Sequence, residues 1–268
     1  MRLQSLYDRI STRIRCKFTR ANSQYASQWI GQPQERLLYA KHMPTTPFQK
    51  IILSGVSAVS VFTDPNRADM LANLGELTGA GALRAIHARM CSDSTGMQVL
   101  CDRPRIRSDA IDKTLLRSLP EDTFGYAYAQ FMDSNGFEAD GRSYVQFVDD
   151  PDLAYVMQRY RELHDLWHTL FGLPATLFGE IVLKYIELVQ TGLPACALSG
   201  FVGQFLMSRE DMRELACVYV PWAYRAGKEA SFLLNIYYEK EFETPLNEFR
   251  ERYNIQVAPP RKRAVCGR

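Results

Sequence analysis

The fold is decided by residues 150–194, DPDLAYVMQRYRELHDLWHTLFGLPATLFGEIVLKYIELVQTGLP. Apolar side chains recur in this stretch every three or four positions, which is the period of an amphipathic α-helix. The first apolar stripe consists of Leu153, Met157, Tyr160, His164, Trp167, His168 and Phe171. Gly172 and Pro174 end this helix, and a second helix from about Thr176 to Gln190 ends at Gly192. The stretch therefore predicts two helices joined by a tight turn.

The flanking sequence continues the helical pattern. Residues 64–90 predict helices that begin with Asp64 as an N-cap and Pro65 in the first turn. Residues 209–253 predict two or three amphipathic helices, one of them formed by residues 221–242.

The central part of the chain is less regular. Residues 101–112 and 118–142 contain most of its turn signals, notably Asn135-Gly136 and Asp140-Gly141. We expect these segments to be surface connections around one short helix. The sequence contains no internal repeat and no convincing strand alternation. We therefore predict a mainly α protein, a single-domain helical bundle with irregular central connections.

The two ends of the chain differ from its body. The first twenty residues contain six of the 32 basic residues and one of the 30 acidic residues, with apolar side chains at helical spacing. This pattern is typical of a mitochondrial transit peptide, and the alternative is a solvated, frayed arm. We assign residues 1–35 to this leader, residues 36–255 to the helical domain and residues 256–268 to a basic, disordered tail.

Composition disfavours several classes of protein. Beyond the leader the chain has more acidic than basic residues, so it lacks the clustered basic face of a nucleic-acid-binding protein. The six cysteines form no CxxC pair and show no regular spacing. A disulfide framework or a cysteine zinc site is therefore disfavoured, and a reducing compartment fits.

His164 and His168 are two of only four histidines in the chain. Helical residues four apart lie about 40° and about 6 Å from each other, so both imidazoles can reach one ion. Asp165 lies about 100° round from His164, where it would complete a chelate or orient a ligand. The return into the second helix brings Glu180 opposite His168. The alternative is a pair of ordinary core histidines, although unpaired polar groups there would cost about 1–3 kcal/mol each.

The types of ligand atom limit which metals and which classes of reaction fit the site. Two histidines and two carboxylates suit Zn²⁺, Mn²⁺, Co²⁺ or Fe²⁺. In HExxH metalloproteases a glutamate follows the first histidine and acts as the general base. Here that residue is Asp165, which is one methylene shorter, so a protease is disfavoured. If one carboxylate does not coordinate, the remaining two-His, one-carboxylate set keeps open positions that are also used for oxygen chemistry.

One family carries this pattern as its signature. Residues 147–194 contain HDxxH, then eleven residues, then Glu180, and they resemble the signature region of the mitochondrial ubiquinone (coenzyme Q) biosynthesis protein numbered four in the Coq series. The resemblance extends from KHMPTTPFQK at residue 41 to NIYYEKEFETPLNEFRERYNI at residue 255. All four motif positions match.

The resemblance implies more than the residues show. It implies a divalent metal, usually zinc, held by His164, Asp165, His168 and Glu180, with cobalt, manganese or iron as alternatives. It implies a helical protein, peripheral on the matrix face of the mitochondrial inner membrane and associated with the multiprotein complex of coenzyme Q enzymes. It also implies a metal-dependent, oxidative decarboxylase that removes the C1 carboxyl group of a polyprenylated 4-hydroxybenzoate (4-hydroxy-3-methoxy-5-polyprenylbenzoate). Self-association is a further expectation.

Such a substrate needs a dry groove for its polyprenyl tail. Residues 51–62 and 193–207 are the longest uncharged runs, and both are too short or too interrupted to span a bilayer, which takes about 20 residues. We expect them to line a lipid groove, and the alternative is that they are buried core helices. Two other functions stay open: a non-catalytic scaffold that binds lipid and metal, and an unrelated metal hydrolase, which Asp165 disfavours.

Overall fold

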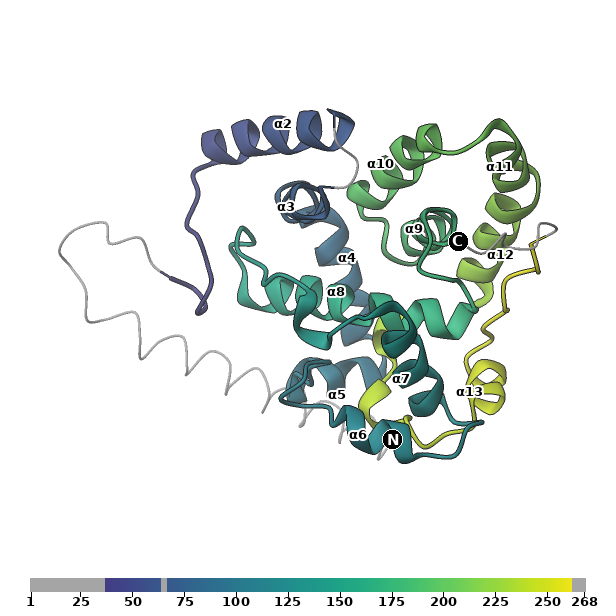
Figure 1. Ribbon diagram of the computed structural model, residues 1–268. Helices are drawn as coiled ribbons and strands as arrows, with labels where there is room; N and C mark the ends of the chain where they lie inside the picture. Colours follow the sequence, from purple (N-terminus) through teal and green to yellow (C-terminus); the bar gives the residue numbers. More distant parts are fainter. Residues whose placement is uncertain (1–36, 64–66, 262–268) are drawn as a thin grey trace, which may run out of the picture. The chain divides into compact units, whose positions relative to one another are not determined.

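The structure of the protein, a computed structural model, describes residues 37–63 and 67–261. In this part of the chain the regular elements are all helices, apart from an isolated bridge between Thr123 and Pro245 (Figure 1). The predicted mainly α, single-domain fold is confirmed. The transit-peptide prediction for residues 1–35 and the cap prediction for Asp64 and Pro65 lie outside the described residues.

The central element is α8 (Pro151–Phe171), which the sequence predicts correctly. The Asp150 carboxylate caps it by accepting hydrogen bonds from the amides of Asp152 and Leu153. Gly172 ends it in the left-handed region, at a φ of +67°, which a glycine adopts without steric strain. Every residue from Leu153 to Phe171 is buried, so α8 has no solvent-exposed face along that length.

Burial of the polar side of α8 depends on ion pairs. Arg161 lies 2.7 Å from Glu76, and Glu162 lies 2.5 Å from Arg105. Arg159 is fully buried and pairs with Glu239. The helix therefore has the amphipathic pattern of a surface helix, but its charged side is covered by other parts of the chain. Buried charges are tolerated when they are paired in this way.

The second predicted helix is α9 (Leu177–Thr191), which begins after a cap from Thr176 and ends at Gly192. It packs against α10 (Pro194–Gly203) and α12 (Val220–Glu229), and it also contacts α8.

α2 (Pro47–Thr63) packs on α3 (Ala68–Thr78), and α3 also contacts α10. α4 (Ala80–Cys91) follows and packs against α8 (Figure 1). The two apolar runs of the sequence correspond to α2 and to α10 with its following 3-10 turn, Gln204–Leu206. No helix in the described residues is long and apolar enough to cross a bilayer.

The central region contains more helix than predicted. It forms α5 (Ser94–Asp102), α6 (Lys113–Ser118) and α7 (Phe124–Asn135), with a 3-10 turn at Ala139–Gly141. The expectation of a surface connection is wrong for α7, which buries Phe124, Tyr128 and Met132 against α8 and the core. These residues recur every four positions, and Thr123 caps the helix. The neighbouring turn signals obscured this period.

The predicted helix over residues 221–242 is wrong in its second half. α12 ends at Glu229, and two 3-10 turns follow, Leu233–Asn235 and Tyr238–Lys240. Leu233, Leu234, Ile236 and Tyr238 are all buried. A helix would spread these side chains around its circumference, whereas the irregular path directs all of them into the core.

α11 (Arg209–Glu214) leads through a π-helical turn, Leu215–Tyr219, into α12, and α13 (Leu246–Arg252) is the last helix. The tail predicted to be disordered from residue 256 is packed as far as Arg261. The amide of Ala258 donates to the carbonyl of Phe171 at 2.8 Å, and Arg261 pairs with Asp211. The disorder prediction is therefore wrong for residues 256–261, and residues 262–268 lie outside the description.

Candidate metal centre

Two helices bring three of the four candidate ligands together. His164 and His168 lie one turn apart on α8, and Glu180 lies in the first turn of α9. The two carboxylate oxygens of Glu180 each lie 3.1 Å from one Nε2 atom, Oε2 from that of His164 and Oε1 from that of His168. The two Nε2 atoms are 3.2 Å apart. Among the described residues this is the one group of three His, Cys, Asp or Glu with ligand atoms within 4.8 Å of one another.

The outer ring nitrogens of both histidines face hydrogen-bond acceptors. His164 Nδ1 is 2.6 Å from Glu187 Oε1, and His168 Nδ1 is 3.1 Å from the carbonyl oxygen of Leu173. A carbonyl or an ionised carboxylate can only accept, so each Nδ1 carries the hydrogen and each Nε2 presents a lone pair. Two lone pairs and a carboxylate that face one another so closely form a donor set for a divalent ion.

This donor set fits the predicted metal. Two imidazole nitrogens and one carboxylate oxygen are ligands of Zn²⁺ and of similar divalent ions. His164 and His168 are buried, whereas the side chain of Glu180 is 37% exposed. The two buried histidines would therefore hold a metal from the protein interior, and the metal would be accessible to solvent on the side of Glu180.

The charge of Glu180 also suits this role. Burial alone would raise the pKa of its carboxyl group, but His164 and His168 hold that pKa well below its usual range when their rings are protonated and Nε2 donates to the carboxylate. The carboxylate is therefore ionised at neutral pH, which is the form that binds a metal.

Asp165 is the candidate ligand that does not join the group. Its Oδ1 accepts a hydrogen bond from Arg142 at 2.6 Å instead. Asp165 lies next to His164 on a helix, and the rotation of one residue directs its side chain toward Arg142. In this geometry Asp165 is therefore not placed as a direct metal ligand. Instead, it holds Arg142 beside the centre.

Glu187 is a site residue that the sequence analysis missed. Its side chain is completely buried, and it lies seven residues after Glu180 on α9. Besides His164, it bonds to Lys184 and to the Tyr160 hydroxyl, each at 2.6 Å. Burial alone would raise its pKa, but Lys184 and His164 hold it well below the usual range. The signal in the sequence was a glutamate two helical turns after Glu180, on the same face of the helix and three residues after Lys184.

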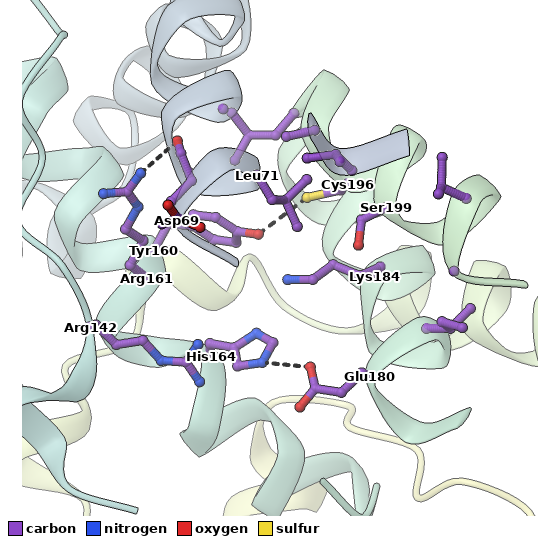
Figure 2. Close-up of a pocket in the computed structure, with 18 of the residues that line it drawn as sticks. Asp69, Leu71, Arg142, Tyr160, Arg161, His164, Glu180, Lys184, Cys196 and Ser199 are labelled. Atoms are coloured by element: carbon purple, nitrogen blue, oxygen red, sulfur yellow. Dashed lines mark hydrogen bonds and ion pairs between the residues drawn. The ribbon is translucent and has the colours of Figure 1, made fainter. Parts of the chain in front are cut away.

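The centre opens into a cavity of about 590 Å³ between α2, α3, α8, α9 and α10. One end of the cavity is polar, and there Arg142, His164, Glu180 and Lys184 point toward a common space (Figure 2). The rest is mostly apolar, lined by residues that include Val61, Leu71, Met157, Leu193, Val202 and Leu206. Both uncharged runs of the sequence contribute to this wall, α10 and its following turn more than α2.

The approach of α9 to the turn after α8 depends on Gly179. A Cβ atom at this position would lie 2.0 Å from the carbonyl oxygen of Pro174, so Gly179→Ala requires the backbone to move. We expect this substitution to lower the free energy of unfolding by about 1–3 kcal/mol. We also expect weaker Zn²⁺ binding, because Glu180 is the next residue. Chemical denaturation and a chelator competition measure the two effects.

The control for this prediction is Gly81→Ala on α4. A Cβ atom at Gly81 meets nothing within 4 Å. Replacing a helical glycine with alanine at an open position stabilises by about 0.5–1 kcal/mol. If Gly179→Ala is as stable as Gly81→Ala and binds Zn²⁺ as the parent does, the turn does not set the position of Glu180.

Fold and site together define a class: a helical protein with a His-His-Glu centre at the polar end of an apolar cavity. The sequence profile described as "Coenzyme Q (ubiquinone) biosynthesis protein Coq4" matches residues 39–259 of the chain. The chain belongs to this family, as the HDxxH signature implies. The family supports a role in ubiquinone biosynthesis.

Curated relatives agree with this assignment. The mitochondrial ubiquinone biosynthesis protein COQ4 homologue of Xenopus tropicalis is 48% identical over 227 residues, which cover 85% of this chain and 80% of the relative. The human homologue is 44% identical over 223 residues, which cover 83% of this chain and 84% of the relative. Both proteins are named as mitochondrial.

A solved structure has the same fold. The crystal structure of a candidate ubiquinone biosynthesis protein from Nostoc punctiforme superposes with a TM-score of 0.62 at 19% identity. The match covers 76% of this chain and 97% of the other. The arrangement of helices is therefore shared well beyond the range of close sequence similarity.

Proposed function

We propose that this protein is a metal-dependent carboxy-lyase of ubiquinone biosynthesis, which removes the C1 carboxyl group of 4-hydroxy-3-methoxy-5-polyprenylbenzoate. The observation that carries the proposal is the continuity of the His164, His168 and Glu180 centre with one cavity. That cavity has a polar end for an aromatic acid and a mostly apolar remainder for a polyprenyl tail.

Two cations flank the polar end. Arg142 is held by Asp165 at 2.6 Å, and Lys184 is held by Glu187 at 2.6 Å, so both are fixed before a substrate enters. Each has more donor hydrogens than these single pairings use, and both side chains line the cavity. We infer that they bind the carboxylate and the phenol oxygen of the substrate and orient its ring.

The reaction requires charge to move between two ends of that ring. The phenol oxygen lies para to C1, so its electrons can increase the electron density at C1 and assist attack by an electrophile. With a proton as the electrophile, C1 gains hydrogen, and the C1–carboxyl bonding electrons return to the ring as CO₂ leaves. With dioxygen as the oxidant, one oxygen atom forms a hydroxyl group on C1 and CO₂ leaves, while the other oxygen atom leaves as water after a reductant supplies two electrons and two protons. A bound divalent ion would act as a Lewis acid for an oxygen ligand in either case.

The main competing function is a non-catalytic scaffold that binds lipid and metal. A structural zinc ion is normally closed by four protein ligands, whereas a catalytic ion keeps an open position. Here three candidate ligands converge, Asp165 pairs with Arg142, and Glu180 is partly exposed beside the cavity. This arrangement favours catalysis.

The direct test uses purified protein of known metal content. It is incubated with a prenylated 4-hydroxybenzoate, with and without oxygen, and the products are identified by mass spectrometry. We expect a product that lacks the C1 carboxyl group and carries hydrogen or hydroxyl at C1. Protein that binds both metal and substrate but leaves the precursor unchanged would support the scaffold instead.

We further propose that the protein lies on the matrix face of the mitochondrial inner membrane. Support comes from the relatives, which are named as mitochondrial, and from an apolar surface on α2. This α2 surface consists of exposed large side chains at helical spacing: Phe48, Ile51, Ile52, Val56, Val59 and Phe62. Val61 of the same helix and Leu206 line the cavity, so a tail could pass from the bilayer into it. Organisation of the biosynthetic complex and self-association remain predictions.

The double substitution Val56→Asp with Val59→Asp tests this surface. The two side chains are 55% and 63% exposed, so charges there should leave the fold intact and weaken lipid contact. Because interfacial binding scales with the apolar area buried in lipid, we expect vesicle binding to fall by about tenfold or more. Flotation with vesicles of phosphatidylcholine and cardiolipin measures it.

The matched control is Leu115→Asp, which places a charge at a 58% exposed position on α6. It should float as the parent protein does. Equal flotation of the α2 double variant and the parent would show that the α2 surface is not the membrane contact.

A further inference from the structure

We propose that Glu187 is a positioning residue for the metal centre: it fixes the ring orientation and the tautomer of His164 and thereby sets metal affinity. The proposal rests on the metal centre of the proposed function but not on the reaction. Glu187 is outside the HDxxH-x11-E signature. It comes from α9, the same helix as Glu180, so one helix supplies both a ligand and the group that orients another ligand.

Glu187 bonds to His164 on the outer side of the imidazole ring. Glu187 Oε1 lies 2.6 Å from His164 Nδ1, on the side of the ring opposite the Nε2 that faces Glu180 and His168. An ionised carboxylate there keeps the hydrogen on Nδ1 and leaves the Nε2 lone pair directed at the ion. It also makes the imidazole a stronger donor, as in other carboxylate–histidine–zinc arrangements.

The other carboxylate oxygen of Glu187 is held by neighbouring donors. Glu187 Oε2 receives hydrogen bonds from Lys184 and from the Tyr160 hydroxyl, each at 2.6 Å. Cys196 lies 3.6 Å from the same oxygen. Burial raises the pKa of Cys196 to about 12, so its thiol keeps its hydrogen. The ammonium group can only donate, so this position requires an acceptor.

A glutamine at position 187 cannot meet both requirements. If its amide oxygen faces His164, its NH₂ group faces the Lys184 ammonium, and two donors oppose each other. If its oxygen faces Lys184, its NH₂ group donates to His164 Nδ1 and drives the hydrogen to Nε2. In that case the nitrogen that should bind the ion is blocked. A carboxylate satisfies all these partners at once.

His168 provides an internal comparison. Its Nδ1 bonds to the backbone carbonyl of Leu173 at 3.1 Å, and no side-chain substitution removes that acceptor. Of the two histidine ligands, His164 is therefore the one whose orientation depends on a replaceable side chain. A variant at Glu187 should change His164 and leave His168 as it is.

The test is Glu187→Gln, measured by competition of the full-length protein with a chelator for Zn²⁺. Loss of a carboxylate that orients a ligand lowers metal affinity by about 10- to 100-fold, and we expect a loss in that range. The matched control is Glu162→Gln, which neutralises a buried glutamate of α8 that pairs with Arg105, away from the centre. Its Zn²⁺ affinity should stay within about threefold of the parent, well below that loss.

A second readout reports the mechanism rather than the affinity. Nitrogen NMR of the metal-free protein, recorded at a pH where both imidazole rings are neutral, distinguishes their tautomers. We expect the hydrogen of His164 on Nδ1 in the parent, a change of His164 in Glu187→Gln, and no change of His168. Should Glu187→Gln not fold, Glu187→Asp keeps the charge but withdraws it from Nδ1. That variant should bind Zn²⁺ more weakly, by about tenfold, which is outside the range allowed for the control.

The outcomes are distinct. If the parent protein binds no Zn²⁺ at these residues, the metal centre and the proposed function fail together. If the parent binds Zn²⁺ and the Glu187 variants bind it equally well with His164 unchanged, the positioning role alone is wrong. Weaker binding by Glu187→Gln but not by Glu162→Gln, with an altered His164, supports it.

Discussion

Glu180→Ala is expected to remove Zn²⁺ binding and to lower turnover of a prenylated 4-hydroxybenzoate by about a thousandfold or more. Glu180 provides the only carboxylate of the three converging donors, and both of its oxygens face histidine nitrogens. A Lewis-acidic ion contributes several kcal/mol of charge stabilisation, and each factor of ten in rate corresponds to about 1.4 kcal/mol. Metal content and single-turnover rates measure the two losses.

The control for this substitution is Glu138→Ala, which removes a glutamate whose side chain is 73% exposed. We expect it to keep full metal content and turnover. Glu180→Ala protein that is folded, free of metal and fully active would contradict the assignment of the centre.

The second large effect is expected from closing the apolar part of the cavity. Ser199 on α10 lines the cavity, and Ser199→Trp would fill part of its space of about 590 Å³. Each buried CH₂ group contributes about 0.8 kcal/mol, so displacing one isoprene unit costs about 3 kcal/mol of binding. We expect kcat/KM for a long-tailed substrate to fall by about a hundredfold, with the metal content unchanged.

Two comparisons make this result specific to the tail. A substrate with a single isoprene unit should lose much less activity than a long-tailed one, because its short tail needs less of the apolar space. Ala197→Trp adds the same side chain at an exposed position of α10 and should have little effect. An equal loss with short and long tails would mean that the cavity does not hold the tail.

The parts of the fold predicted correctly are those fixed by local signals. The limits of α8 and α9 follow from caps and left-handed glycines at Asp150, Gly172 and Gly192, all close in sequence to the elements they end. The convergence of His164 with Glu180 could also be predicted, because a short turn between two helices leaves few ways for them to face each other.

The parts that were missed depend on contacts between distant segments. Nothing near Asp165 in the sequence indicates that Arg142, 23 residues earlier, would pair with it. Likewise the charged side of α8 predicts a solvent-exposed face, but Glu76, Arg105 and Glu239 arrive from elsewhere and neutralise it. The periodicity of a helix does not show which distant residue pairs with a buried charge. The ion pairs around the metal centre are therefore visible only in the three-dimensional structure.

Substrate labelled with ¹³C in its C1 carboxyl group measures metal-dependent decarboxylation most directly. We expect Zn²⁺-loaded protein to release labelled CO₂ in proportion to the substrate consumed. Removing the metal with a chelator should stop the release, and adding metal back should restore it, except in Glu180→Ala. Labelled CO₂ released at the same rate by metal-free protein, or none released by metal-loaded protein in the presence of oxygen and a reductant, would show that the metal centre is not the site of decarboxylation.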